Sequence, residues 1–162
     1  MALTVEDGTG KVDSDSYGSV DGASDYAEAY GRNEWEALLP AKREVRLRLA
    51  TQYIETMYEA RGAKLREEQA LSFPTREKGL PVGVVRATYE LATYPGLPTL
   101  LPEDMISQIE SESKELSGLK KSVKYRTATA PLRRRYYVAD GLLKPFVRSI
   151  AGGITTGILA LG

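Results

Sequence analysis

PAKREVRLRLATQYIETMYEARGAKLREEQALSFP, residues 40–74, is the stretch that decides the fold. Apolar side chains recur in it every four residues and are widened by two neighbours, which gives the stripe Val45, Leu49, Tyr53 and Met57 with Ala50 and Ile54. The charged residues lie mostly on the opposite side, namely Lys42, Arg43, Arg46, Arg48 and Glu55. The pattern predicts a central packed helix from Pro40 to about Ala60. No residue of the stretch suggests catalysis, so we look for function in the segments attached to it.

Five further segments have recognisable patterns on either side of this helix. The expected elements are a helix over 22–30 capped by Ser19 or Asp21, a short turn from Asn33 to Leu39, a helix over 82–94, a strand over 120–127 and a helix over 138–150. Within 82–94 we expect Val85, Tyr89 and Ala92 to face inward. The predicted fold is therefore mainly α, a small bundle of four to five helices with a short β strand or hairpin and extended N- and C-terminal arms. We expect one helical domain over 1–150 and an apolar arm over 151–162.

Two residue types are missing from the 162 residues, because the chain has neither cysteine nor histidine. Disulfides, thiolate nucleophiles, His-based triads and metal sites built on these side chains are therefore excluded. Carboxylate or lysine chemistry remains open, but no cluster of residues defines a site. We expect no enzymatic activity and no cofactor. The apolar run over 150–162 is too short for a membrane span, which needs roughly 20 residues, so we expect no membrane contact.

The irregular segments of the sequence are expected to have structural roles and show no complete catalytic or metal-binding motif. Residues 1–16 are rich in turn-forming residues and predict a solvated loop. Asp13 and Asp15 have the spacing of calcium ligands, but the glycine and the final glutamate of an EF-hand loop are missing. Leu71 and Phe73 are expected to anchor a loop on the core.

Charge is unevenly distributed although the formal net charge is zero. The first thirty residues are acidic, with Lys11 as their single cation. Basic residues gather later in the chain, at Lys120, Lys121, Lys124, Arg126, Arg133, Arg134 and Arg135, and Tyr136 and Tyr137 follow them. Cations beside aromatic rings are typical of a DNA-facing patch. The alternative is a solvated basic turn with one tyrosine packed on the core. Separated charges also suit head-to-tail contacts between copies.

The C-terminal segment is uncharged and rich in glycine, with large apolar side chains at Ile150, Ile154, Ile158, Leu159 and Leu161. Alone in water it would expose an apolar surface of a size that usually marks a contact. We therefore predict that these residues bind a partner subunit, with strand addition as one mode.

Several motifs resemble one family when they are read in order. They are Val5-Glu6-Asp7-Gly8-Thr9-Gly10, Ser16-Tyr17, Asp25-Tyr26-Ala27 with Trp35, Ala50–Glu55, Gln69–Pro74 and Pro81–Ala92. The order is similar to that of small tailed-bacteriophage proteins often labelled DnaT-like single-stranded-DNA-binding proteins, which resemble head–tail connector, or neck adaptor, proteins. The resemblance covers roughly residues 3–94.

This resemblance implies a structural virion protein made in the host cytoplasm. It implies a ring of about twelve copies between a portal protein and a tail or nozzle protein. Genome DNA would pass through the ring and touch its basic surface only transiently. The alternative function is a single-stranded-DNA-binding accessory of replication. The scattered aromatic residues disfavour that alternative, because stacking sites gather aromatic rings on one surface.

Overall fold

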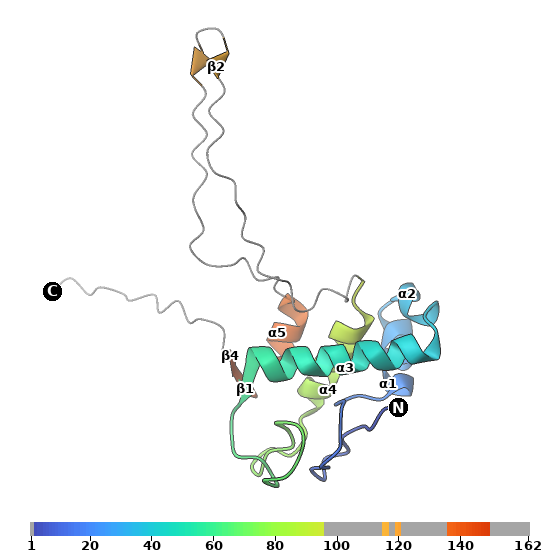
Figure 1. Ribbon diagram of the computed structural model, residues 1–162, viewed down its shortest axis with the longest axis vertical. Coiled ribbons are helices and arrows are strands. Elements are labelled where there is room, and N and C mark those ends of the chain that lie inside the picture. Colours follow the sequence, from blue (N-terminus) through green and yellow to red (C-terminus); the bar gives the residue numbers. More distant parts are fainter. Residues whose placement is uncertain (1, 96–114, 117–118, 121–135, 150–162) are drawn as a thin grey trace, which may run out of the picture. The chain divides into compact units, whose positions relative to one another are not determined.

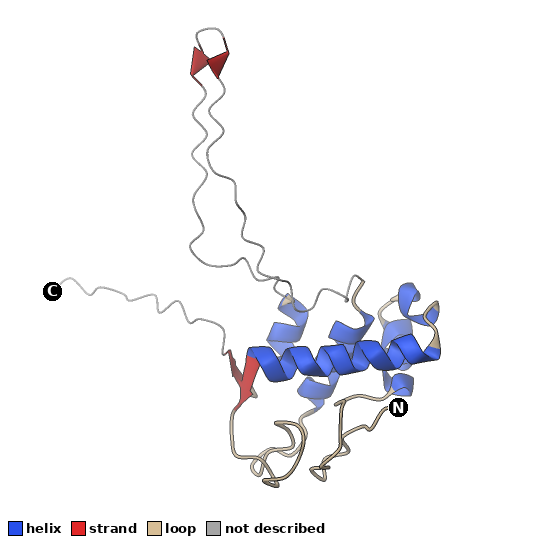
Figure 2. Cartoon of the chain, viewed as in Figure 1, coloured by secondary structure: helices blue, strands red, loops and turns tan. Residues whose placement is uncertain are grey.

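A computed structural model describes residues 2–95, 115–116, 119–120 and 136–149 (Figures 1 and 2). The described helices are α1 (Val20–Ala29), α2 (Asn33–Glu36), α3 (Pro40–Met57), α4 (Val82–Thr93) and α5 (Tyr137–Leu143). The described strands are β1 (Tyr58–Ala60), β2 (Glu115–Leu116), β3 (Leu119–Lys120) and β4 (Val147–Ser149). The chain divides into one unit of residues 1–100 and 136–162, called the body below, and a second unit of residues 101–135. The mainly α fold with a small antiparallel sheet confirms the predicted class.

The two short helices of the body begin close to their predicted positions. Ser19 caps α1 by accepting a hydrogen bond from the Gly22 amide, and the helix ends before Gly31, whose φ of 66° suits glycine. Asn33 was expected to cap the next turn, but it lies inside α2, and Arg32 is the N-cap without a side-chain hydrogen bond. Trp35 is fully buried, as expected from its position.

The central helix corrects the predicted apolar stripe. The buried face of α3 consists of Leu47, Ala50, Thr51, Tyr53 and Ile54. Val45, by contrast, is 45% exposed. A spacing of four residues drifts around a helix by roughly 40° per step, whereas positions 47, 50, 51 and 54 combine three- and four-residue steps and stay on one face. The stripe drawn through Val45 was therefore wrong at its first turn.

Two helices, the central one and the last one, end earlier in the structure than predicted. The central helix stops at Met57 and continues as β1. The last helix stops at Leu143, because Pro145 lacks the amide that would continue the helical hydrogen bonds. Residues 144–149, expected to be helical, are instead a turn followed by β4, which runs antiparallel to β1 with Ala60 opposite Val147.

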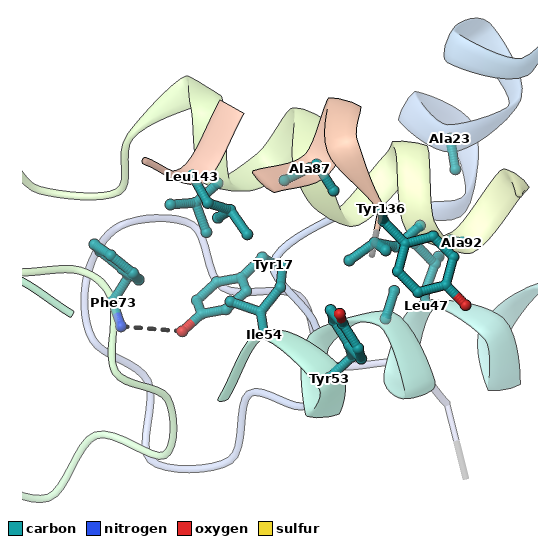
Figure 3. Packing of buried hydrophobic residues seen from close by; sticks show 14 of the residues in the cluster. Tyr17, Ala23, Leu47, Tyr53, Ile54, Phe73, Ala87, Ala92, Tyr136 and Leu143 are labelled. Carbon is teal, nitrogen blue, oxygen red and sulfur yellow. Dashed lines mark hydrogen bonds between the residues drawn. The ribbon is translucent and has the colours of Figure 1, made fainter. Parts of the chain in front are cut away.

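The core of the body lies between α3, α4 and α5 and is closed by α1 and the loop before α4 (Figure 3). The face of α4 that packs inward contains Val84, Ala87, Leu91 and Ala92, so Ala92 was predicted correctly, whereas Val84 replaces Val85. A Cβ atom on Gly83 would lie 2.6 Å from the Phe146 ring and 2.8 Å from the Leu142 carbonyl oxygen. Glycine at this position therefore allows α4 and α5 to approach closely.

The second unit contains the antiparallel pair β2 and β3, in which Glu115 lies opposite Lys120. Of the strand predicted over 120–127, only Lys120 belongs to the described residues. No helix within the described part of the chain is long and apolar enough to span a bilayer.

Candidate functional site

The N-terminal loop is organised around one carboxylate. Glu6 is 2% exposed and accepts hydrogen bonds from the amides of Gly8, Gly10 and Lys11, each at 2.9 Å. The Ser14 hydroxyl donates a fourth, at 3.1 Å. Buried carboxylates are costly unless donors surround them, and here the donors come almost entirely from the loop backbone. The prediction of a solvated loop was therefore wrong for this residue.

A second polar side chain organises the loop between β1 and α4. Gln69 accepts from the Arg66 amide at 2.9 Å and donates to the carbonyls of Leu71 and Pro74, at 2.8 and 3.0 Å. The Ala70 amide donates to the Lys11 carbonyl at 2.9 Å and so joins the two loops. Leu71 and Phe73 are 8% and 1% exposed, which confirms that they anchor this loop on the core.

Tyr17 joins both loops to the central helix. Its hydroxyl donates to Glu55 and accepts from the Phe73 amide at 3.1 Å (Figure 3). The other oxygen of Glu55 accepts from the amide and hydroxyl of Ser72, at 3.0 and 2.8 Å. Burial raises the pKa of Tyr17 well above its usual range, and the Glu55 carboxylate adds to this effect, so the phenol remains a hydrogen-bond donor.

Two more tyrosine–carboxylate pairs hold helices together. Glu90, 4% exposed on α4, accepts from the Tyr26 hydroxyl at 3.0 Å and from Arg32 at 2.8 Å. Tyr58 donates to Asp140 and so connects β1 to α5. Burial, followed by the carboxylate partner, raises the pKa of Tyr26 and of Tyr58 above the usual tyrosine value. These carboxylates and phenols bind one another, which is a structural use of groups that could otherwise do acid–base chemistry.

Sequence reasoning missed these buried acids because it placed charged residues on the surface. Glu90 stands within Tyr89-Glu90-Leu91-Ala92, an otherwise uncharged run on an apolar helix, and Glu6 directly precedes Asp-Gly-Thr-Gly. An acid in an apolar run, or next to glycines whose amides can approach closely, is the signal that could have identified them. The described residues contain no group of three acidic side chains arranged to hold a metal ion.

The body has two points at which the chain continues beyond the described residues. The rings of Tyr94 and Tyr136 pack edge to face with centroids 5.2 Å apart, so the described residues on the two sides of 96–135 meet at one place. Residues 150–162 continue from β4, next to the end of α3.

The balance of acidic and basic residues differs between the described helical part of the chain and residues 96–135. Residues 2–95 and 136–149 contain 17 Asp or Glu and 14 Lys or Arg, whereas residues 96–135 contain 5 and 8. Asp21, Asp25 and Glu28 are exposed along α1. An open hollow of about 410 Å³ lies between α1 and α2 and is lined by residues that include Asp25, Glu28 and Arg32. The surface of the body is therefore not a basic one.

Most residues of the two predicted sites lie outside the described part of the chain. For the basic patch these are Lys121, Lys124, Arg126, Arg133, Arg134 and Arg135, and for the partner-binding set they are Ile150, Ile154, Ile158, Leu159 and Leu161. Lys120 alone is described, as the last residue of β3. Both sites therefore stay predictions.

Comparison with known proteins identifies a family. Neither curated proteins nor solved structures gave a significant match. The family model described as "Putative DnaT-like ssDNA binding protein" matches residues 1–159. The match includes the Glu6 loop, the Gln69 loop and the whole helical body. The chain therefore belongs to the family of DnaT-like ssDNA binding proteins.

Proposed function

We propose that this protein is a structural adaptor of a tailed-phage virion, a subunit of a ring between the portal protein and the tail through which the genome passes. The observation that supports the proposal is a contrast in composition between the described helical core and two other segments of the sequence, the basic residues 96–135 and the apolar residues 150–162. Three large aromatic side chains of the described core are fully buried, namely Trp35, Tyr17 and Phe73. The basic segment lies in the sequence between Tyr94 and Tyr136, whose rings are in contact, and the apolar segment follows β4.

Such a contrast suits a subunit that is joined to its neighbours by extended segments. A closed body provides a rigid block, and segments of contrasting character can bind different partners. The basic segment would face either DNA or an acidic protein surface, and the apolar segment would face the portal or the next subunit. We propose that the protein has no catalytic activity and binds no cofactor, because the buried acids and tyrosines form hydrogen bonds with one another.

Co-assembly with the portal protein tests this proposal. The purified chain is mixed with the portal protein of the same phage and examined by native mass spectrometry and cryo-electron microscopy. We expect a ring of adaptor subunits on the portal. A chain lacking residues 152–162 should lose most of this assembly and keep the far-ultraviolet circular dichroism of the intact body. Absence of any complex with the intact chain would contradict the adaptor function.

The second candidate is binding of single-stranded DNA, which the family description favours. One described residue adds to it, because Tyr137 is 78% exposed and directly follows the basic run Arg133–Arg135 and Tyr136. Exposed aromatic rings beside cations are the stacking sites of such proteins. Tyr30 is also exposed, at 62%, but it ends the acidic helix α1, where DNA is repelled.

Fluorescence anisotropy separates the two candidates. A DNA-binding accessory should bind a labelled oligonucleotide with a submicromolar dissociation constant that rises steeply with salt. Replacing Arg133, Arg134 and Arg135 with alanine should lower the salt slope by about 2, since each phosphate contact on a single strand contributes about 0.7. Tyr137→Ala should weaken binding further, while Tyr30→Ala should not. A structural adaptor should show only weak binding near physiological salt.

A further inference from the structure

Among the described residues, no strand lies on the edge of β4 that faces away from β1, and this edge has an unusual feature. In β4, Val147 is 4% exposed and lies opposite Ala60. The Arg61 amide donates to the Phe146 carbonyl, which makes Ala60 and Val147 a non-hydrogen-bonded pair of the antiparallel ladder. The amide and carbonyl of Val147 therefore point away from β1. Ser149 has the same orientation, two residues further along.

The outward amide of Val147 has no hydrogen-bond partner among the described residues, although its carbonyl accepts from the Arg61 side chain at 3.0 Å. Buried backbone amides without an acceptor are rare in native proteins, because each costs about 1–3 kcal/mol. An unpaired amide at a buried strand edge indicates that another strand belongs beside it.

The sequence after β4 has the pattern of such a strand. Residues 147–158 read VRSIAGGITTGI, two runs rich in β-branched residues separated by Gly152-Gly153. Two glycines between such runs are typical of a two-residue hairpin turn. The alternation places Ile154, Thr156 and Ile158 on one face.

The register of this hairpin agrees with the orientation of β4. A two-residue turn at 152–153 pairs 151 with 154, 149 with 156, and 147 with 158, and hydrogen bonds join every second pair beginning at the turn. Positions 147 and 149 are therefore in hydrogen-bonded pairs, and these are the two positions whose backbone groups point outward from β1. Paired residues share a face, so Ile158 lies beside buried Val147. A hairpin shifted by one residue would fail both conditions.

We propose that residues 154–158 of the same chain dock on the open edge of β4 and complete a three-stranded antiparallel sheet. The docked strand gives Val147 its missing acceptor and covers Ile154 and Ile158, two of the side chains predicted to bind a partner. The C-terminal segment is thus stored on the body before assembly, and a partner must displace it. This role in assembly rests on the proposed adaptor function, whereas the docking itself does not.

Disulfide trapping in the full chain tests the docking. Because the chain has no native cysteine, only the two introduced thiols can form the disulfide. Positions 148 and 157 form a non-hydrogen-bonded pair, with Cα atoms about 4.5 Å apart, a separation that a disulfide can span. The variant Arg148→Cys/Gly157→Cys should oxidise to a monomer with an internal disulfide. The matched control Arg148→Cys/Thr156→Cys places the second thiol on the opposite face and should oxidise at least tenfold more slowly.

Either of two other results would overturn the proposal. Disulfide-linked dimers would show that the strand of a second copy occupies the edge, and equal rates in the two variants would show that no defined strand docks there. As a second measurement, the Val147 amide should exchange with deuterium at least tenfold faster in a chain ending at Gly153 than in the intact chain. These measurements need no portal protein, so their failure is distinguishable from failure of the adaptor function.

Discussion

The body contains two regions that reach the same degree of burial by different means. On the loop side, Glu6 and Gln69 fix irregular backbone by hydrogen bonds from buried polar side chains. On the helix side, α4 and α5 pack through small residues, with Gly83 and Ala139 allowing close approach. Helices satisfy their own backbone groups, whereas loops need side chains to do so. Three of the motifs that carry the family resemblance lie on the loop side, namely Val5–Gly10, Ser16-Tyr17 and Gln69–Pro74, and the others lie on helices.

The motifs on the loop side have a structural role in the body. Gly8 and Gly10 have φ angles of 94° and 75°, and they present their amides to Glu6. A side chain on Gly10 would also lie 3.0 Å from the Gln69 amide oxygen. Such residues are constrained because one loop conformation requires them. In this body they determine architecture, and the segments proposed to bind partners lie elsewhere in the chain.

The largest effect is expected for the loop side. Glu6→Ala leaves four donors without their acceptor and should lower the free energy of unfolding by about 4 kcal/mol, since each unsatisfied buried donor costs about 1–3 kcal/mol. Urea unfolding followed by circular dichroism measures it. Asp13→Ala, an exposed acid in the same loop, is the control and should change stability by less than about 0.5 kcal/mol. Equal effects would mean that the loop does not depend on Glu6.

The helix side should respond to the loss of apolar volume. Leu47→Ala removes a fully buried side chain from α3 and should cost about 3 kcal/mol. Val45→Ala, two residues away but 45% exposed, should cost less than about 0.5 kcal/mol. Chemical denaturation of both variants checks the face of α3 directly, and a larger loss for Val45→Ala would restore the stripe expected from the sequence.

Two glycines of the helix side should give opposite signs. Gly83→Ala forces a methyl group against the Phe146 ring and the Leu142 carbonyl, and should destabilise by about 2 kcal/mol through overpacking. Gly141→Ala, in α5, meets no atom within 4 Å and should stabilise by about 0.5–1 kcal/mol through helix propensity. Thermal unfolding measures both. Destabilisation by both changes to the same extent would show that close approach at Gly83 is unimportant.

A smaller destabilisation is expected for a change that tests how the two sides are joined. Tyr17→Phe removes the hydroxyl between Glu55 and Phe73 and should cost about 1.5 kcal/mol at pH 7. Tyr30→Phe, at an exposed position, is the control. Denaturation curves of the two variants should therefore differ clearly in midpoint, and coinciding midpoints would contradict a structural role of this hydroxyl.

Stability should also fall at alkaline pH. The pKa of Tyr17 is raised in the folded protein, so its contribution is complete below the unfolded value of about 10 and decreases above it, by at most about 1.4 kcal/mol per pH unit. Tyr26 and Tyr58 act in the same direction. Unfolding midpoints between pH 8 and 11 should decrease less steeply for Tyr17→Phe than for the native chain. Identical slopes would show that this phenol does not contribute.

Local patterns predicted most of the secondary structure. Ser19 as a cap, Pro40 as the start of α3 and the helix near 82–94 were recognisable because capping and periodicity act over a few residues. The ends of α3 and α5 were predicted too far along the chain. Tyr58 and Val147 become strand residues only because each pairs with a residue of the other strand, 91 and 87 positions away, and no local pattern contains such a long-range pairing.

The sequence by itself determined the helical class, the absence of cysteine and histidine chemistry, the segregated charge and the family motifs. Only the tertiary structure decided that Glu6, Glu55 and Glu90 are internal and that Leu47 faces the core. The physical reason is that a carboxylate is buried only where donors surround it, and some of these donors come from distant segments, as Tyr17 does for Glu55 and Arg32 for Glu90. The open edge of β4 likewise became visible only once β1 was seen to cover its other side.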